Sequence, residues 1–309
     1  MDTMIARAFR IVSMATAVAF FAACAGQEPR HSGGVTASPS GGEVVTNMLA
    51  RFNNLDIQCG GGTNPRLTCN GVYMRATKRG EGFHVWNPNP DSPNKNSVSF
   101  SWLNKRGSFG GLAFDSDNGF TLLPSDQAWQ AGLDPVSALC LFPYDAATWN
   151  RSDDGCGAYP GIPGSGPCQA QNITNADEWI ARYGAGGMYG SQCSFDAHLV
   201  WPVYQGWEVR SKLKRPDLHK LHNEVMLRAW RKDDPGLPLE SFFYIGGSAK
   251  GRGEAMANQR DFKAVIGRWV PVVQIVLPQS EGSDAYFRYL PEDQAVPATR
   301  TASIPSAKH

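Results

Sequence analysis

Residues 71–103, GVYMRATKRGEGFHVWNPNPDSPNKNSVSFSWL, contain the pattern that decides the fold. The stretch opens with an apolar run that carries one arginine, Arg75, and such a run predicts a β-strand. A loop rich in Gly, Pro and Asn follows, and it carries Phe83 and Trp86. The stretch closes on residues 97–103, where serines alternate with apolar residues, a pattern typical of a second strand. We therefore expect two neighbouring strands joined by an aromatic loop.

These residue types can together form a cradle for a nucleotide. A guanidinium such as that of Arg75 can bind a pyrophosphate with two hydrogen bonds. The faces of Phe83 and Trp86 can stack on a base, and the short hydroxyls of Ser97 and Ser99 can hold a sugar. The alternative is that these are two ordinary strands of an α+β domain.

Outside this stretch, hydrophobic periodicity predicts a mixture of strands and helices. Period-2 or continuously apolar runs indicate strands, and apolar residues at helical spacing indicate amphipathic helices. The strands are expected at 136–142, 224–230, 241–245 and 269–277. The helices are expected at 43–52, 201–212 and 254–264. With 33 Gly and 21 Pro in 309 residues, the chain favours a loop-rich α+β domain over a helical bundle.

The N-terminal residues are typical of an export signal. Arg7 and Arg10 precede an apolar run at 11–21 that is too short to span a bilayer as an ordinary helix. The run ends in FAAC, which resembles a bacterial lipobox with Cys24 as the lipidated first mature residue; ordinary signal cleavage nearby is the alternative. We expect a signal peptide at 1–23 and a flexible Gly/Ser/Pro linker at 24–42. The mature protein is then a bacterial envelope lipoprotein or a secreted protein, attached to a membrane only through its lipid.

The composition argues against nucleic acid as the main partner. Without Asp2, Arg7 and Arg10 of the signal, 27 basic and 27 acidic side chains remain, and the sequence has no basic run.

We expect one domain at 43–291 and a disordered polar tail at 292–309.

Apart from Cys24, the sequence has an even number of cysteines, which in an exported chain predicts disulfides. Short spacings favour Cys59–Cys69 and Cys156–Cys168, which leaves Cys140–Cys193, although fifteen pairings are open. A metal site is not expected, because the sequence lacks a Cys-x-x-Cys motif and its histidines lie at the wrong spacing.

Arg75, the serines at 97, 99 and 101, and Glu224 follow one another along the chain in the order Arg–Ser–Glu. This order resembles the arginine class of the ADP-ribosyltransferase superfamily. The runs SVSFSWL, CLFPYDAAT, PCQAQNIT, NEVMLRAW and SFFYIGGSA, spread over residues 45–290, are similar to the halovibrin family of secreted bacterial proteins associated with NAD glycohydrolase activity. The resemblance implies an α+β fold with two small facing β-sheets, flanking helices and a disulfide-stapled insertion.

The resemblance also implies the roles of individual residues. Glu224 would hold the ribose 2′-hydroxyl and stabilise the cationic sugar that forms when nicotinamide leaves NAD. Ser99 would orient Glu224. NAD would be bound by Arg75 and Ser97, and its nicotinamide ring would stack on Phe83 or Trp86. NAD is then the substrate, and no metal is required.

The residue two positions before the glutamate bears on the acceptor of the ADP-ribose. Transferases of this class tend to carry Glu or Gln there, whereas this chain has His222, which favours hydrolysis. Two alternatives remain. One is mono-ADP-ribosylation of a target protein, and the other is a non-catalytic envelope lipoprotein that binds a glycan or a partner through its aromatic loops.

Overall fold

The computed structural model describes residues 39–56, 70–77, 86, 97–133, 136–186, 188–228 and 238–295. Several predictions lie outside these residues: the signal peptide at 1–23, lipidation of Cys24, the role of Phe83, and the Cys59–Cys69 pair. The described residues form the mixed α+β fold expected from the sequence.

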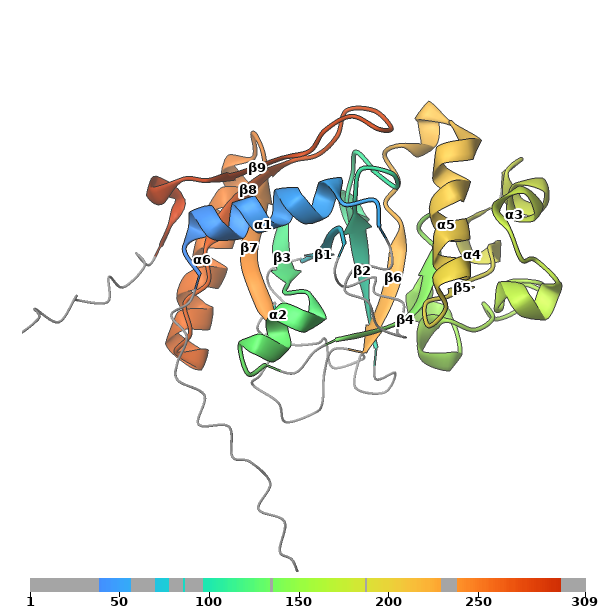
Figure 1. Cartoon of the computed structure of the whole chain (residues 1–309), viewed down its shortest axis with the longest axis horizontal. Coiled ribbons are helices and arrows are strands. Elements are labelled where there is room, and N and C mark those ends of the chain that lie inside the picture. The colour runs from blue at the N-terminus through green and yellow to red at the C-terminus, as the bar shows by residue number, and fades with distance from the viewer. Residues whose placement is uncertain are drawn as a thin grey trace, which may run out of the picture. The chain divides into compact units, whose positions relative to one another are not determined.

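The strands of the described residues form one continuous sheet of nine strands (Figure 1). Their order across the sheet is β5-β4-β6-β2-β1-β3-β7-β8-β9, with β7 parallel to β8 and the other neighbours antiparallel. Their bounds are β1 Val72–Ala76, β2 Val98–Leu103, β3 Asn118–Leu122, β4 Ser137–Phe142, β5 Phe195–Asp196, β6 Glu224–Arg228, β7 Leu239–Ile245, β8 Val272–Val276 and β9 Tyr286–Tyr289. The prediction of two separate facing sheets is therefore wrong, because β2 pairs along both of its edges and joins the two halves.

Strand β2 pairs with a different neighbour along each half of its length. Its second half pairs with β1, as in Met74 opposite Ser101, and its first half pairs with β6, as in Phe100 opposite Val225. Beyond Met74, β1 continues along β3 instead. The sheet therefore opens between the end of β1 and the start of β2, and backbone groups of β2 need other partners there.

Helices cover both faces of the sheet (Figure 1). Their bounds are α1 Gly41–Asn53, α2 Ser125–Gln130, α3 Ala176–Tyr183, α4 Met188–Ser191, α5 Val200–Leu213 and α6 Ala249–Ile266. Helix α1 buries Val44, Met48 and Phe52, four residues apart, in the same core cluster as Phe243 of β7. The neighbouring residue Phe242 belongs to the core cluster that contains α6. Because successive strand residues point to opposite faces, α1 and α6 cover opposite sides of β7.

Most of the predicted elements are present with small shifts of their ends. The strands predicted at 136–142, 224–230, 241–245 and 269–277 correspond to β4, β6, β7 and β8, as far as the described residues extend. Helix α6 is longer than predicted because the N-cap hydroxyl of Ser248 accepts a hydrogen bond from Gly251 N. Strand β9 was not predicted. The described residues continue to Ala295, and Asp293, inside the expected tail, is buried.

The lobe at residues 143–223 follows β4, and one disulfide ties it to β4 while a second lies within it. Cys140 pairs with Cys156, and Cys168 pairs with Cys193. The predicted pairs Cys156–Cys168 and Cys140–Cys193 are therefore wrong. Sequence spacing favoured them, but the chain folds back on the sheet, so that Cys156 lies against β4 and Cys168 lies beside the segment before β5.

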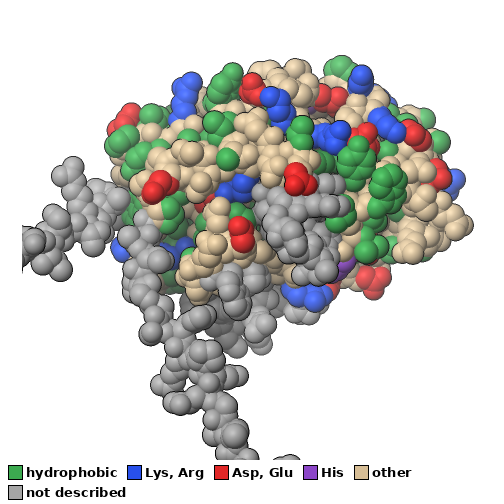
Figure 2. Space-filling view, viewed as in Figure 1, with side chains coloured by type: hydrophobic (Ala, Val, Ile, Leu, Met, Phe, Trp, Pro, Cys, Tyr) green, Lys and Arg blue, Asp and Glu red, His purple; other side chains and the backbone are tan. Residues whose placement is uncertain are grey.

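On the described surface that Figure 2 shows, Lys and Arg side chains are interspersed with Asp and Glu side chains. This distribution agrees with the near-zero net charge of the sequence. None of the helices among the described residues has the length and apolar character needed to cross a membrane.

Candidate functional site

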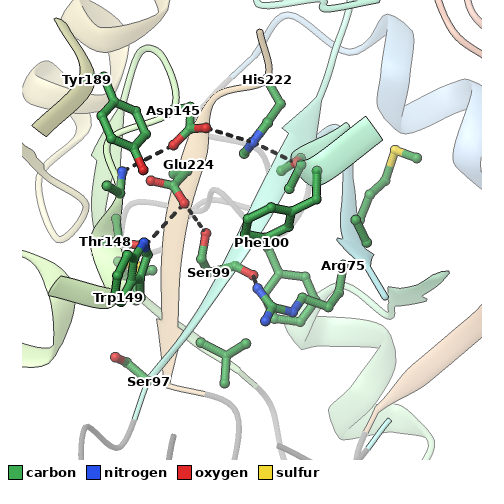
Figure 3. A pocket seen from close by; sticks show the side chains of 18 residues that line it. Arg75, Ser97, Ser99, Phe100, Asp145, Thr148, Trp149, Tyr189, His222 and Glu224 are labelled. Atoms are coloured by element: carbon green, nitrogen blue, oxygen red, sulfur yellow. Dashed lines mark hydrogen bonds and ion pairs between the residues drawn. The ribbon is translucent and has the colours of Figure 1, made fainter. Parts of the chain in front are cut away.

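A cavity of about 620 Å³ lies where the sheet opens between β1 and β2 (Figure 3). This volume falls within the range of pockets that bind small molecules. The cavity brings together five residues selected from the sequence, from three different strands and the turn before β6: Arg75, Ser97, Ser99, His222 and Glu224. The residues that line it are Met74–Ala76, Ser97–Ser101, Ala113, Phe114, Asp145, Ala147–Trp149, Tyr189, His222, Glu224 and Met226.

Glu224 is the first residue of β6, and its carboxylate is held by three hydrogen-bond donors. Oε1 accepts hydrogen bonds from Ser99 Oγ at 2.9 Å and from Thr148 Oγ1 at 3.2 Å. Oε2 accepts one from the backbone N–H of Ala146 at 2.8 Å. A carboxylate has about four acceptor positions, so one position on Oε2 remains for a ligand. The side chain is 7% exposed, so its orientation is fixed.

Ser99 connects Glu224 to Arg75. While its hydroxyl donates to Glu224, its carbonyl oxygen accepts a hydrogen bond of 2.6 Å from Arg75 Nη1. That carbonyl lies where β1 has separated from β2, so the guanidinium takes the place of a backbone partner. Burial lowers the pKa of Arg75, and the charge of Glu224 opposes this shift. Among the described residues, Arg75 makes one hydrogen bond, which leaves guanidinium N–H groups for a ligand.

The segment 145–148 supplies two of the donors to Glu224, Ala146 N and Thr148 Oγ1. Buried side chains fix this segment through hydrogen bonds to its carbonyl oxygens. Arg151 is 2% exposed and donates hydrogen bonds to five carbonyl oxygens, including that of Ala146 at 2.9 Å. Gln192 donates to the carbonyl oxygen of Asp145 at 2.9 Å. Burial lowers the pKa of Arg151 to about 10, with Glu224 opposing the shift, so Arg151 is charged at neutral pH. The positive charge of Arg151 therefore interacts with the negative charge of Glu224.

His222 lies beside Glu224 and faces Asp145. Its Nδ1 is 2.8 Å from the carbonyl oxygen of Asn223 and 3.1 Å from Ser101 Oγ. Because a carbonyl oxygen can only accept, we assign the proton to Nδ1. Nε2 is buried, has no hydrogen-bond partner among the described residues, and lies 3.8 Å from Asp145 Oδ2. The other carboxylate oxygen of Asp145 accepts a hydrogen bond from Ala147 N at 3.1 Å.

Three exposed aromatic side chains line the mouth of the cavity: Phe114, Trp149 and Tyr189, which are 76%, 66% and 60% exposed. The sequence-based prediction gave the stacking role to Phe83 or Trp86. Trp86 does not line the cavity; it is 4% exposed and packs edge-on against Phe262 in the core. The aromatic surface available to a ligand therefore comes from three residues that the sequence did not single out.

Ser97 lines the cavity, but its hydroxyl already donates a 2.6 Å hydrogen bond to the carbonyl oxygen of Asp154. Ser97 therefore ties the loop at 153–155 to β2.

Several residues of the cavity loops have left-handed backbone conformations that are uncommon outside glycine. They are Phe114, Asp115, Ala147, Asp153 and Asp154, with φ between 50° and 57°. Such conformations concentrate at functional sites.

Asp145, Thr148, Trp149, Tyr189 and Phe114 were not assigned to the site from the sequence. The run CLFPYDAAT at 140–148 gave a signal, because polar residues directly follow a buried strand. The sequence gave no such signal for Phe114 and Tyr189, which lie in loops with irregular backbone.

The chain matches no family model and no curated protein. The chemistry of the site therefore has to follow from its geometry. Among the described residues, no group of three or more His, Cys, Asp or Glu side chains is placed to hold a metal ion.

Proposed function

We propose that the protein hydrolyses NAD to nicotinamide and ADP-ribose. The observation that carries this proposal is that Glu224 and Arg75 line one cavity and both contact Ser99. The cavity thus offers a fixed carboxylate, that of Glu224, and the guanidinium of Arg75 a short distance apart. A dinucleotide with a cationic nicotinamide ribose and an anionic pyrophosphate needs both.

Glu224 supports the reaction in two ways. Its remaining acceptor position on Oε2 accepts a hydrogen bond from the ribose 2′-hydroxyl. Its negative charge stabilises the oxocarbenium-like sugar that develops as the bond between C1′ and the nicotinamide nitrogen breaks. The electrons of that bond neutralise the nicotinamide ring, so no acid has to protonate the leaving group. Water then forms the new bond to C1′ and loses a proton.

Arg75 and the aromatic mouth bind the rest of the substrate. The guanidinium N–H groups of Arg75 that have no partner among the described residues donate to the pyrophosphate, for which a planar fork of donors is well suited. Trp149, Tyr189 and Phe114 provide faces on which a nicotinamide or adenine ring can stack. We propose that these residues replace Trp86 in the stacking role.

We also propose that the protein is exported, as the N-terminal sequence predicts. The two disulfides support this proposal, because disulfides persist mainly in oxidising compartments.

Incubation of the purified protein with NAD labelled in its adenosine part tests the proposal. Hydrolysis gives free nicotinamide together with an equal amount of labelled ADP-ribose. Transfer to a protein, the alternative, leaves label on protein when a cell lysate is added. Absence of nicotinamide release in both reactions would contradict the proposal and favour a binding protein.

A further inference from the structure

Hydrolysis of NAD needs a group that binds the attacking water, and Glu224 is poorly placed to be that group. Three of its four acceptor positions are used by Ser99, Thr148 and Ala146 N. The fourth is needed by the ribose 2′-hydroxyl in the proposed function.

The cavity contains a second carboxylate, that of Asp145. Its side chain is 33% exposed and lines the cavity, so solvent reaches it. Oδ1 accepts a hydrogen bond from the backbone N–H of Ala147. The preceding residue, Ala146, donates its backbone N–H to Glu224. One short segment therefore orients both carboxylates, and Figure 3 shows them side by side, with Asp145 between Tyr189 and His222.

His222 faces Asp145 from the protein side. Its ring is 4% exposed, and its Nδ1 is fixed by the carbonyl oxygen of Asn223 and by Ser101 Oγ. Nε2 points at Asp145 Oδ2, 3.8 Å away, and has no hydrogen-bond partner among the described residues. A buried ring nitrogen without a partner is costly, so such groups call for an explanation. With the proton on Nδ1, Nε2 is an acceptor like Asp145 Oδ2, and an explanation is that one water donates a hydrogen bond to each of them.

We propose that Asp145 binds the attacking water and accepts its proton, and that His222 is a positioning residue for that water. The inference rests on the proposed hydrolysis of NAD. As the C1′–N bond breaks and nicotinamide leaves with the bonding electrons, a lone pair of the water oxygen forms the C1′–O bond. The released proton passes to Asp145 Oδ2 and from there to solvent.

A comparison of two reactions of the same enzyme tests this inference. Release of nicotinamide to form ADP-ribose requires water, whereas exchange of labelled nicotinamide into NAD requires cleavage of the C1′–N bond but no water. We expect Asp145→Asn to lower hydrolysis about a hundredfold, the usual contribution of a general base, and to leave exchange within about threefold of wild type. We expect His222→Gln to lower hydrolysis about tenfold, with little further loss in the double variant, because the two residues act as one unit.

The chain offers a matched control. Asp196 and His198 form a second Asp–His pair, 3.0 Å apart, but on the surface and outside the cavity. Asp196→Asn and His198→Gln should leave both reactions unchanged. Thermal unfolding of each variant checks the fold, and Asp145→Asn decides the question even if the buried His222→Gln variant does not fold.

Two results would overturn the inference. One is hydrolysis by Asp145→Asn within about threefold of an active wild type. The other is an equal fall of hydrolysis and exchange, because it would mean that Asp145 supports the site as a whole. If the wild-type protein releases no nicotinamide, the proposed function fails and this inference fails with it.

Discussion

The hydroxyl of Ser99 and the carboxylate of Glu224 are 2.9 Å apart, although 125 residues separate them in the chain. They meet because β6 pairs with the first half of β2, which places the start of β6 beside Ser99. On the other edge of β2, Arg75 donates to the carbonyl oxygen of Ser99. One serine therefore fixes the position of both charged groups of the proposed site.

Loss of the Ser99 hydroxyl should impair catalysis more than loss of the neighbouring Ser97 hydroxyl. We expect Ser99→Ala to lower kcat for nicotinamide release about tenfold, because a hydrogen bond to a charged group is worth about 1.5–3 kcal/mol. Ser97→Ala should change kcat less, since Ser97 donates to the carbonyl oxygen of Asp154 and not to Glu224. Steady-state kinetics of both variants measure this. Equal losses would contradict the role given to Ser99.

Replacement of Arg75 by Lys should mainly weaken substrate binding. Lysine keeps the positive charge but lacks the planar fork of donors that matches a pyrophosphate. We expect the KM for NAD to rise about tenfold, which is about 1.4 kcal/mol, with a smaller change in kcat. Arg288→Lys, on the exposed side of β9, is the control. An unchanged KM for NAD in the Arg75 variant would mean that Arg75 does not bind the substrate and serves only as the hydrogen-bond partner of Ser99 where β1 and β2 separate.

The two disulfides should differ in their effect on activity. Removal of either, as Cys140→Ala with Cys156→Ala or as Cys168→Ala with Cys193→Ala, should cost about 3 kcal/mol of stability on the chain-entropy model. The Cys140–Cys156 bond packs with Ala146, whose N–H donates to Glu224. Its removal should therefore lower nicotinamide release more than removal of the Cys168–Cys193 bond, measured at a temperature at which both variants are folded. The reverse order of activities would contradict this.

Asp117 should make stability depend on acidity. Desolvation by burial raises the pKa of Asp117, but the hydrogen bonds from Ser248, from Asn118 and from its own backbone, together with the charge of Lys250, lower the pKa below 3.8. A lowered pKa in the folded state stabilises the fold above the unfolded value, and this stabilisation is lost as the pH falls through the folded value. Between about pH 5 and pH 3, wild type should therefore lose more of its free energy of unfolding than Asp117→Asn. Urea unfolding at both pH values measures the difference, and equal losses would exclude the contribution.

Much of the sheet and part of the site could be predicted from the sequence. Alternating serines at 97–101 and the apolar run before Arg75 are local patterns, and local patterns determine strands. Glu224 begins an apolar run after a polar turn, but it was singled out by its place in the Arg–Ser–Glu order, which resembles that of the ADP-ribosyltransferases. These residues lie on strands, so the sheet register brings them to one cavity.

The remaining parts of the site depend on loops, whose conformation follows from tertiary contacts. Arg151 fixes the segment 145–148 through carbonyl oxygens as distant as that of Gln192, and no local pattern encodes such contacts. The pairing of Cys140 with Cys156 depends on the same folding back of the lobe. Trp86 was assigned to a ligand because it lies in a Gly- and Pro-rich loop, but it fills the core next to Phe262. Aromatic residues in such loops can serve either purpose, and the sequence does not distinguish them.

The rate of nicotinamide release from NAD by wild type and by Glu224→Gln tests the central claim most directly. Glutamine keeps the size of the side chain but removes the negative charge that stabilises the cationic sugar. We expect the wild-type protein to release nicotinamide and the variant to be slower by at least about a hundredfold. Glu292→Gln, an exposed glutamate outside the cavity, should match wild type. Equal rates for wild type and a folded Glu224→Gln variant would contradict the account.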